Sequence, residues 1–193
     1  MKTTILKKTV QSIFIFIFLF SFSSSSSAQK LVSNQTHIKF FSTTPAEDIE
    51  SNNYATTSTL DTEKGAIVFS VPMQSFEFEK SLMQKHFNQK KFLNTKEYPT
   101  AKLTGQITDI EKVDFNQDGT YDVNVKGDLT IKGISQSINE KGTIVIKNGK
   151  ATANSKFFVT LADYGVEFSR GKPSKNIADK VEVTVLAEYP LSK

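Results

Sequence analysis

Residues 121–146 read YDVNVKGDLTIKGISQSINEKGTIVI, and this stretch decides the fold class. Over residues 123–131 the odd positions are apolar or glycine and the even positions are polar. A period of two is typical of a β-strand with one dry and one wet face. Gly127 falls on the dry face, which indicates a bend or a close approach of two backbones. A bent, one-sided strand suits the wall of a β-barrel.

The same stretch predicts a second strand. The chain leaves the first strand at Lys132 and Gly133 and passes through residues 134–138. We interpret Lys141 and Gly142 as turn residues, because glycine is favoured where the chain reverses. The next strand is predicted over residues 143–147.

Six further segments have the same alternation and end at turn residues. They are predicted as strands over residues 37–42, 54–60, 66–73, 100–110, 151–161 and 179–189. With the two central strands they make eight, and no linker or internal repeat divides the chain. The fold prediction is therefore all-β, an eight-stranded antiparallel sheet that closes into a barrel.

Residues 79–98 break the β pattern. Leu82, Met83, His86 and Phe87 recur at spacings of three and four, which is the helical period. Pro99 pushes the residue before it toward extended geometry and ends any helix there. We expect one short helical segment within residues 79–98, between two strands.

The first 28 residues resemble a secretory signal peptide. Three lysines precede an apolar run over residues 13–20, and a serine tract ends at Ala28 with small residues at the cleavage site. The apolar run is shorter than the roughly 20 residues that span a bilayer. We expect a mature domain over residues 29–193 that is periplasmic or secreted, without a transmembrane segment. The chain has no cysteine, which excludes a lipid-anchored lipoprotein.

Charge and cysteine content exclude several classes of function. Removal of Lys2, Lys7 and Lys8 with the signal lowers the net charge from +4 to +1. The mature surface then lacks the basic field on which nucleic-acid binding relies, so we expect no nucleic-acid partner. Without cysteine the chain has no disulfides, thiolate catalysis or cysteine-ligated metal sites. Stability must come from one packed core.

Three runs resemble the YceI-like family of exported, polyisoprenoid-binding bacterial proteins. They are HFNQKKFLNTKEYPTAKLTG over residues 86–105, GDLTIKGISQSI over residues 127–138, and the tail from KFFVTLADYGV to DKVEVTVLAEY over residues 156–189. The resemblance covers nearly the whole mature chain. It implies a lipocalin-like extended β-barrel whose interior holds a long isoprenoid or a similar amphiphile, and a protein that is not an enzyme.

The residues themselves indicate no catalytic or metal site. No motif such as Gly-x-Ser-x-Gly places a serine at a strained turn beside His37 or His86. Residues 114–119 match the first half of a calcium loop, but Val125 stands where the bidentate glutamate belongs. We interpret this segment as a hairpin loop in which Gly119 supplies a positive φ.

Phenylalanine is the unusual component, with eleven in the mature chain and no tryptophan. A fully packed core would explain all of them, and so would an apolar tunnel. The family resemblance favours the tunnel. Its predicted lining is Ile67, Phe69, Phe76, Phe78, Leu82, Met83, Phe87, Phe92, Leu103, Ile107, Val123, Val125, Leu129, Ile131, Phe157, Val159, Val183 and Val185.

Two functions of different classes follow. The first is an exported carrier of a polyisoprenoid or similar long-chain amphipathic lipid, with no cofactor besides that lipid. The second is a ligand-free structural or stress-response protein of the cell envelope that acts through its surface. The helical segment serves either as a lid for the ligand or as a plug that keeps the core dry. Whether the domain forms a homodimer is left open.

Overall fold

The structure is a computed structural model that describes residues 29–166 and 176–191. The predicted signal peptide, residues 1–28, lies outside the described residues. The strands of the described part are β1 (Lys30–Thr43), β2 (Asp48–Asp61), β3 (Ala66–Pro72), β4 (Glu77–Phe78), β5 (Thr100–Ile107), β6 (Gly119–Ile131), β7 (Ile134–Lys147), β8 (Lys150–Thr160) and β9 (Lys180–Pro190). The helical elements are α1 (Ser81–Asn88) and the 3-10 turns η1 (Met73–Ser75), η2 (Ile110–Lys112) and η3 (Leu161–Tyr164).

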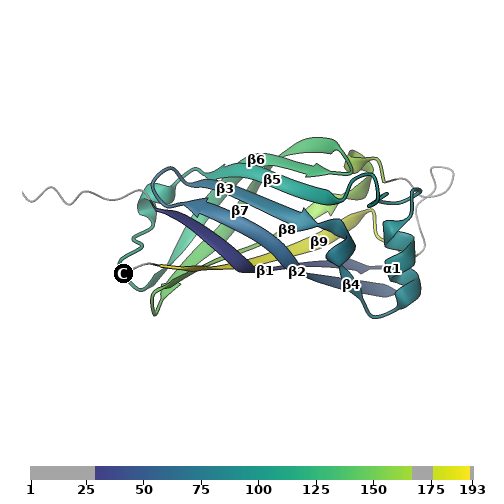
Figure 1. Cartoon of the computed structure of the whole chain (residues 1–193), viewed down its shortest axis with the longest axis horizontal. Coiled ribbons are helices and arrows are strands. Elements are labelled where there is room, and N and C mark those ends of the chain that lie inside the picture. Colours follow the sequence, from purple (N-terminus) through teal and green to yellow (C-terminus); the bar gives the residue numbers. More distant parts are fainter. Residues whose placement is uncertain (1–28, 167–175, 192–193) are drawn as a thin grey trace, which may run out of the picture.

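Eight of these strands close into an antiparallel barrel (Figure 1). The order around the wall is β1-β9-β8-β7-β6-β5-β3-β2, and β2 pairs again with β1. The predicted eight-stranded barrel is thus confirmed. The short strand β4, which was not predicted, pairs with β2 at Ser51 and Asn52.

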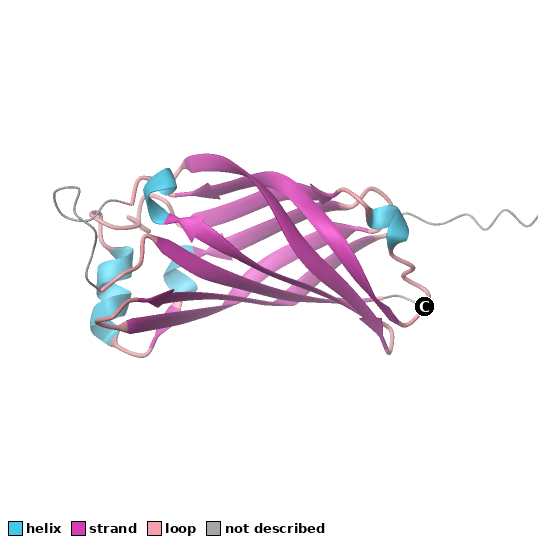
Figure 2. Ribbon diagram, turned by 180° about the vertical axis from the view of Figure 1, so that it is seen from behind, coloured by secondary structure: helices cyan, strands magenta, loops and turns pink. Residues whose placement is uncertain are grey.

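The two ends of the barrel differ. Figures 1 and 2 show α1 and β4 at one end, which we call the α1 end, while β9 finishes at the opposite end. At that opposite end Leu31, Ile110, Val113 and Ile146 are buried in the core.

Between residues 29 and 166 and between 176 and 191, no helix is long and apolar enough to cross a membrane.

The central hairpin differs from its prediction. β6 and β7 pair without interruption from Gly119 with Ile146 to Ile131 with Ile134. The turn is formed by Lys132 and Gly133, with φ of 51° and 77°, as a two-residue hairpin turn requires. The predicted turn at Lys141 and Gly142 is wrong, because Gly142 lies inside β7 opposite Val123.

The first two strands are longer than predicted. The expected segments, residues 37–42 and 54–60, cover only part of β1 and β2. The missing parts carry polar side chains that nevertheless lie inside the barrel, since Ser33, Ser51 and Asn53 are all 1% exposed or less. Hydrophobic alternation cannot show a strand whose inward side chains are polar.

The expected helical segment is confirmed, but the helix itself covers only Ser81–Asn88 of residues 79–98. Residues 89–98 form turns closed by backbone bonds from the amides of Asn94 and Tyr98.

The connection before β6 differs from its prediction in part. Residues 108–118 join the antiparallel pair β5 and β6 through η2 and a turn in which the Gln117 amide donates to the Asp114 carbonyl oxygen, so the predicted hairpin loop is present. Gly119 begins β6 without a positive φ, so the conformation predicted for it is wrong.

Gly127 confirms the prediction of a close approach of two backbones. It pairs with Gly105 across β5 and β6. A Cβ atom added to Gly127 would lie 2.5 Å from the Cα of Gly105, far inside contact distance. The barrel wall can therefore bend tightly here only because neither residue has a side chain.

Candidate functional site

A cavity of about 620 Å³ occupies the barrel interior. It extends from Leu82 and His86 on α1 to Leu60 and Tyr189 deep in the barrel. Apolar side chains make up most of its wall. The barrel is therefore partly open inside rather than completely filled.

The predicted tunnel residues all line this cavity. They come from every part of the wall except β1, β2 and β7: Ile67 and Phe69 of β3, Phe76 and Phe78 around β4, Leu82, Met83 and Phe87 of α1, Phe92 after it, Leu103 and Ile107 of β5, Val123, Val125, Leu129 and Ile131 of β6, Phe157 and Val159 of β8, and Val183 and Val185 of β9. The residues on the long strands follow strand parity, because inward positions alternate along each strand. Those on and around α1 do not depend on it. That they contact a ligand stays a prediction.

Several lining residues were missed by sequence reasoning. Ile38 and Phe40 of β1 and Ile49 of β2 are apolar and follow the inward parity, which is a signal that could have found them. Ile138 and Glu140 also line the cavity. Sequence reasoning misses them because Lys141 and Gly142 predict a turn, which leaves this part of β7 outside the predicted strands.

An aromatic cluster holds α1 against the barrel, and Phe87 lies at its centre. Its ring stacks on that of Phe40, with centroids 5.7 Å apart, and lies 5.4 Å from Phe76 and 5.1 Å from Phe78. Phe92 follows at 6.2 Å. Phe87 is 5% exposed, so the inner face of α1 belongs to the core although Leu82 is 60% exposed.

A polar rim borders the cavity at the α1 end. The Lys80 ammonium lies 2.9 Å from one carboxylate oxygen of Glu47, and the Asn176 amide donates to the other oxygen at 3.1 Å. The bond from Lys80 and, to a smaller extent, the bond from Asn176 hold the pKa of Glu47 below its ordinary value. Three separate segments, before β2, before α1 and before β9, thus meet at the rim.

The family assignment rests on a match over most of the chain. The family model of the YceI-like domain matches residues 25–189. The chain belongs to the YceI-like family. No curated protein sequence matches it.

Solved structures share the fold of this YceI-like domain at low sequence identity. A polyisoprenoid-binding domain from Saccharophagus degradans has a TM-score of 0.68 at 13% identity, over 86% of this chain and 99% of that one. BcnA of Burkholderia cenocepacia has a TM-score of 0.66 at 18% identity, over 79% of this chain and 95% of that one. The Campylobacter jejuni YceI protein has a TM-score of 0.56 at 14% identity, over 98% and 94%.

A buried chain of hydroxyl groups lies in the wall of the YceI-like domain. The Tyr189 phenol donates to Ser58 Oγ at 2.8 Å, Ser58 shares a hydrogen bond of 2.9 Å with Thr36, and Thr36 donates to Ser33 at 3.2 Å. Burial raises the pKa of Tyr189 to about 12. Each of these four hydroxyl groups has a hydrogen-bond partner. The group of four therefore stabilises the junction of β1, β2 and β9 and offers no free hydroxyl to a ligand.

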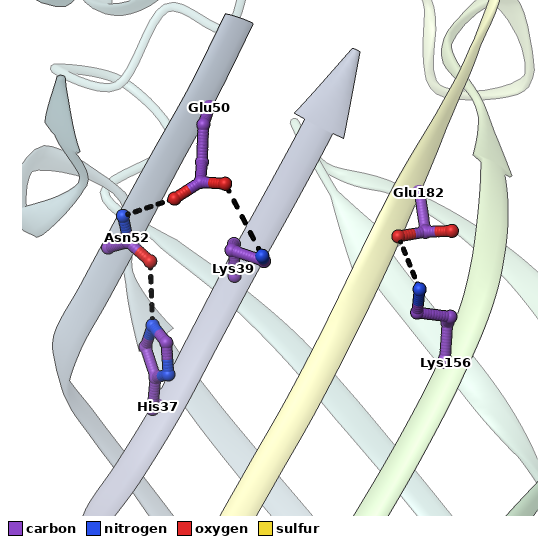
Figure 3. Close-up of polar contacts among 6 residues, drawn as sticks. All are labelled: His37, Lys39, Glu50, Asn52, Lys156 and Glu182. Carbon is purple, nitrogen blue, oxygen red and sulfur yellow. Dashed lines mark hydrogen bonds and ion pairs between the residues drawn. The ribbon is translucent and has the colours of Figure 1, made fainter. Parts of the chain in front are cut away.

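The outer face of the YceI-like domain carries pairs of charged and polar side chains (Figure 3). Lys39 lies 3.3 Å from Glu50, and Lys156 lies 2.9 Å from Glu182. His37 Nε2 forms a hydrogen bond of 2.8 Å with Asn52 Oδ1. These contacts join neighbouring strands outside the cavity.

Proposed function

We propose that this YceI-like protein is a carrier that holds a polyisoprenoid or similar long-chain amphipathic lipid in its barrel. The observation that carries the proposal is the apolar cavity that begins at α1 and continues deep into a closed barrel. The fold likeness to a solved polyisoprenoid-binding domain supports the same ligand class. We propose binding rather than catalysis, since His37 lies on the outer face and His86 at the rim of the cavity.

The dimensions of the cavity suit one apolar chain. Pockets for small ligands have volumes of roughly 300–1,000 Å³, and this cavity has about 620 Å³. Each methylene removed from water contributes about 0.8 kcal/mol, so about ten would contribute about 8 kcal/mol. That free energy corresponds to a dissociation constant of about 1 µM before the entropy of ordering the chain is subtracted. Polar contacts are therefore needed for selectivity more than for affinity.

We also propose that residues 1–28 direct export and are then removed, which places the carrier in the periplasm or outside the cell. The lysine-flanked apolar run and the small residues before Gln29 support this proposal. Mass spectrometry of the protein from the exported fraction tests it. A mature chain that begins near Gln29 is expected, whereas an exported chain that retains residue 1 would contradict removal.

The ligand is tested by extraction of the purified, exported protein. Organic solvent should release a long-chain lipid in a fixed ratio to protein, detected by mass spectrometry, and the delipidated protein should rebind that lipid. A sample unfolded before purification is the control for lipid that adheres without a cavity. Folded protein that neither carries nor rebinds lipid would contradict the proposal and favour a ligand-free envelope protein acting through its surface.

A further inference from the structure

Two neighbouring strands of the barrel separate along much of their length. β7 and β8 pair only from Gly142 with Ser155 to Lys147 with Lys150. Beyond that point β7 continues to Ile134 paired with β6 alone, and β8 continues to Thr160 paired with β9 alone. The two edges that face each other there form no strand ladder. We call the space between residues 134–141 and 156–160 the β7–β8 slot.

The β7–β8 slot is continuous with the cavity. Ile138 and Glu140 line the cavity from one side of the slot, and Phe157 and Val159 line it from the other. At the point where pairing stops, outward-facing Thr143 and Asn154 also border the cavity. The side chains that line a cavity inside a barrel are the inward-facing ones. Contact with outward positions on both strands, next to the place where their ladder ends, indicates that the cavity reaches into the gap between them.

The end of the slot nearest η3 is bridged. The Gln136 side-chain amide donates to the carbonyl oxygen of Asp163 at 2.8 Å, and the Lys132 ammonium donates to the carbonyl oxygen of Gly165. At the other end Ser155 Oγ donates to the carbonyl oxygen of Lys141 at 2.7 Å. The slot is thus a bounded gap in the wall, with a defined position between two fixed ends.

Glu140 lies in this gap. It pairs directly with Val125, so its side chain is on the inner face of the sheet. Its neighbours around the cavity are mostly apolar, and it is half-buried. Within residues 29–166 and 176–191, its carboxylate makes no hydrogen bond or ion pair. A carboxylate in such surroundings is stabilised by any donor that reaches it.

We propose that the β7–β8 slot is a second opening of the cavity, at which Glu140 binds the hydrogen-bond-donating head group, an ammonium or a hydroxyl, of a single-chain amphiphile. This inference rests on the proposed lipid-binding function and adds the head group and its position. The tail lies in the apolar cavity, and the head group lies between the strands, where unpaired backbone groups offer further hydrogen bonds. An anionic head group is disfavoured there by repulsion from Glu140.

The head group is tested with three straight-chain probes of one length: an alkylamine, an alkanol and an alkanoate. Each is titrated into delipidated protein below its micelle concentration by calorimetry. Wild-type protein should bind the amine most tightly and the alkanoate most weakly. Glu140→Gln should weaken amine binding by about tenfold and strengthen alkanoate binding, while alkanol binding changes little, because the amide still accepts a hydrogen bond.

A matched variant separates the slot from the α1 end. Glu47→Gln removes the other carboxylate that borders the cavity and should leave the order of the three probes unchanged. If Glu47→Gln alters the order and Glu140→Gln does not, the head group lies at the α1 end and the inference is wrong. If no probe binds wild-type protein, the proposed function itself fails. If all three bind equally to wild type and to Glu140→Gln, only the inference fails.

The opening is tested by thiol labelling, because the chain has no cysteine of its own. Ile138→Cys places a thiol at the slot, and Met83→Cys places one at the α1 end. A charged, bulky thiol reagent should modify both at comparable rates in delipidated protein. The alkylamine should protect Ile138→Cys. A slot thiol that reacts a hundredfold more slowly than the α1-end thiol would show that the wall is closed.

Discussion

The side-chain amide of Asn53 donates a hydrogen bond of 2.8 Å to the carbonyl oxygen of Pro72, at a place where β2 and β3 no longer pair. The side-chain oxygen of Asn53, Oδ1, accepts from the Ala55 backbone amide and from the Thr56 hydroxyl, both at 3.0 Å. One buried side chain thus replaces the missing ladder. Among the residues that the structure describes, no side chain bridges the β7–β8 slot between its two ends in this way.

We predict that Asn53→Ala destabilises the protein by about 2–4 kcal/mol, because it leaves several buried polar groups without partners. Urea unfolding followed by circular dichroism measures this change. Asn52→Ala is the matched control. The Asn52 side chain is next to Asn53 in the sequence but lies on the outer face, where it bonds to His37 and Glu50. Equal losses in the two variants would contradict the role given to Asn53.

A charge on the cavity wall should prevent lipid binding. Leu129 lines the cavity on β6, and Leu129→Lys would place an ammonium without a partner among apolar side chains. We expect at least a tenfold loss of affinity or a loss of folding, measured by lipid titration and circular dichroism. Thr120→Lys adds the same charge to the exposed face of β6 and should change neither. A folded Leu129→Lys protein with wild-type affinity would refute the assigned inner face.

Phe87 should contribute more to stability than any other side chain of α1, because it is buried among four other aromatic rings. Replacement by alanine is expected to lower the free energy of unfolding by about 3–5 kcal/mol. Leu82→Ala, on the exposed side of the same helix, should lower it by less than about 1 kcal/mol. Chemical denaturation of both variants gives the comparison.

Met83 distinguishes a lid from a plug. It is half-buried and borders the cavity at the α1 end, one helical turn before Phe87. If α1 acts as a lid, Met83→Ala should speed lipid release several-fold while stability falls by about 1 kcal/mol or less. Stopped-flow transfer of a fluorescent lipid to vesicles measures the release rate. Wild-type release together with a much lower melting temperature would identify α1 as a plug.

Tyr189 should make stability fall at alkaline pH. Burial raises its pKa to about 12, above the ordinary value of 10.0, so the folded state retains the phenol proton longer than the unfolded chain. This contribution is present in full below pH 10 and is lost as the pH rises toward 12, by about 1.4 kcal/mol per pH unit. Tyr189→Phe should remove that part of the slope. Ser58→Ala, which removes the hydrogen-bond acceptor of Tyr189 but leaves the phenol buried, should retain it.

The inward positions filled by apolar side chains could be predicted from the sequence, and those filled by polar side chains could not. Val123, Val125 and Leu129 alternate with polar residues, so burial on one face is visible in the residues themselves. Ser51 and Asn53 are buried as deeply, but their hydrogen-bond partners are carbonyl oxygens of other strands, Glu77 of β4 and Pro72 of β3. A single sequence contains no local signal for such partners.

The same limit explains the errors near Gly142. A lysine followed by glycine is common in turns, and here glycine instead allows β8 to approach, since an added Cβ would lie 2.7 Å from the Asn154 carbonyl oxygen. A turn at this position would leave residues 134–141 outside the barrel wall. The inward position of Glu140 and the β7–β8 slot follow only from the register of β7 against β6 and β8, which the sequence does not show.

The order in which the barrel can be completed follows from β1. This strand pairs with β2, which comes next in the chain, and also with β9, the last strand, where Gln35 faces Glu188. Until residues 180–190 arrive, β1 and β8 each present an unpaired edge on which a strand of another molecule can add. A chain cut short before Lys180 should therefore aggregate rather than form a smaller barrel. The closing step pairs β1 with β9, which lie far apart in the sequence. We therefore expect closure to be slow compared with hairpin formation, so that the incomplete sheet stays exposed until it occurs.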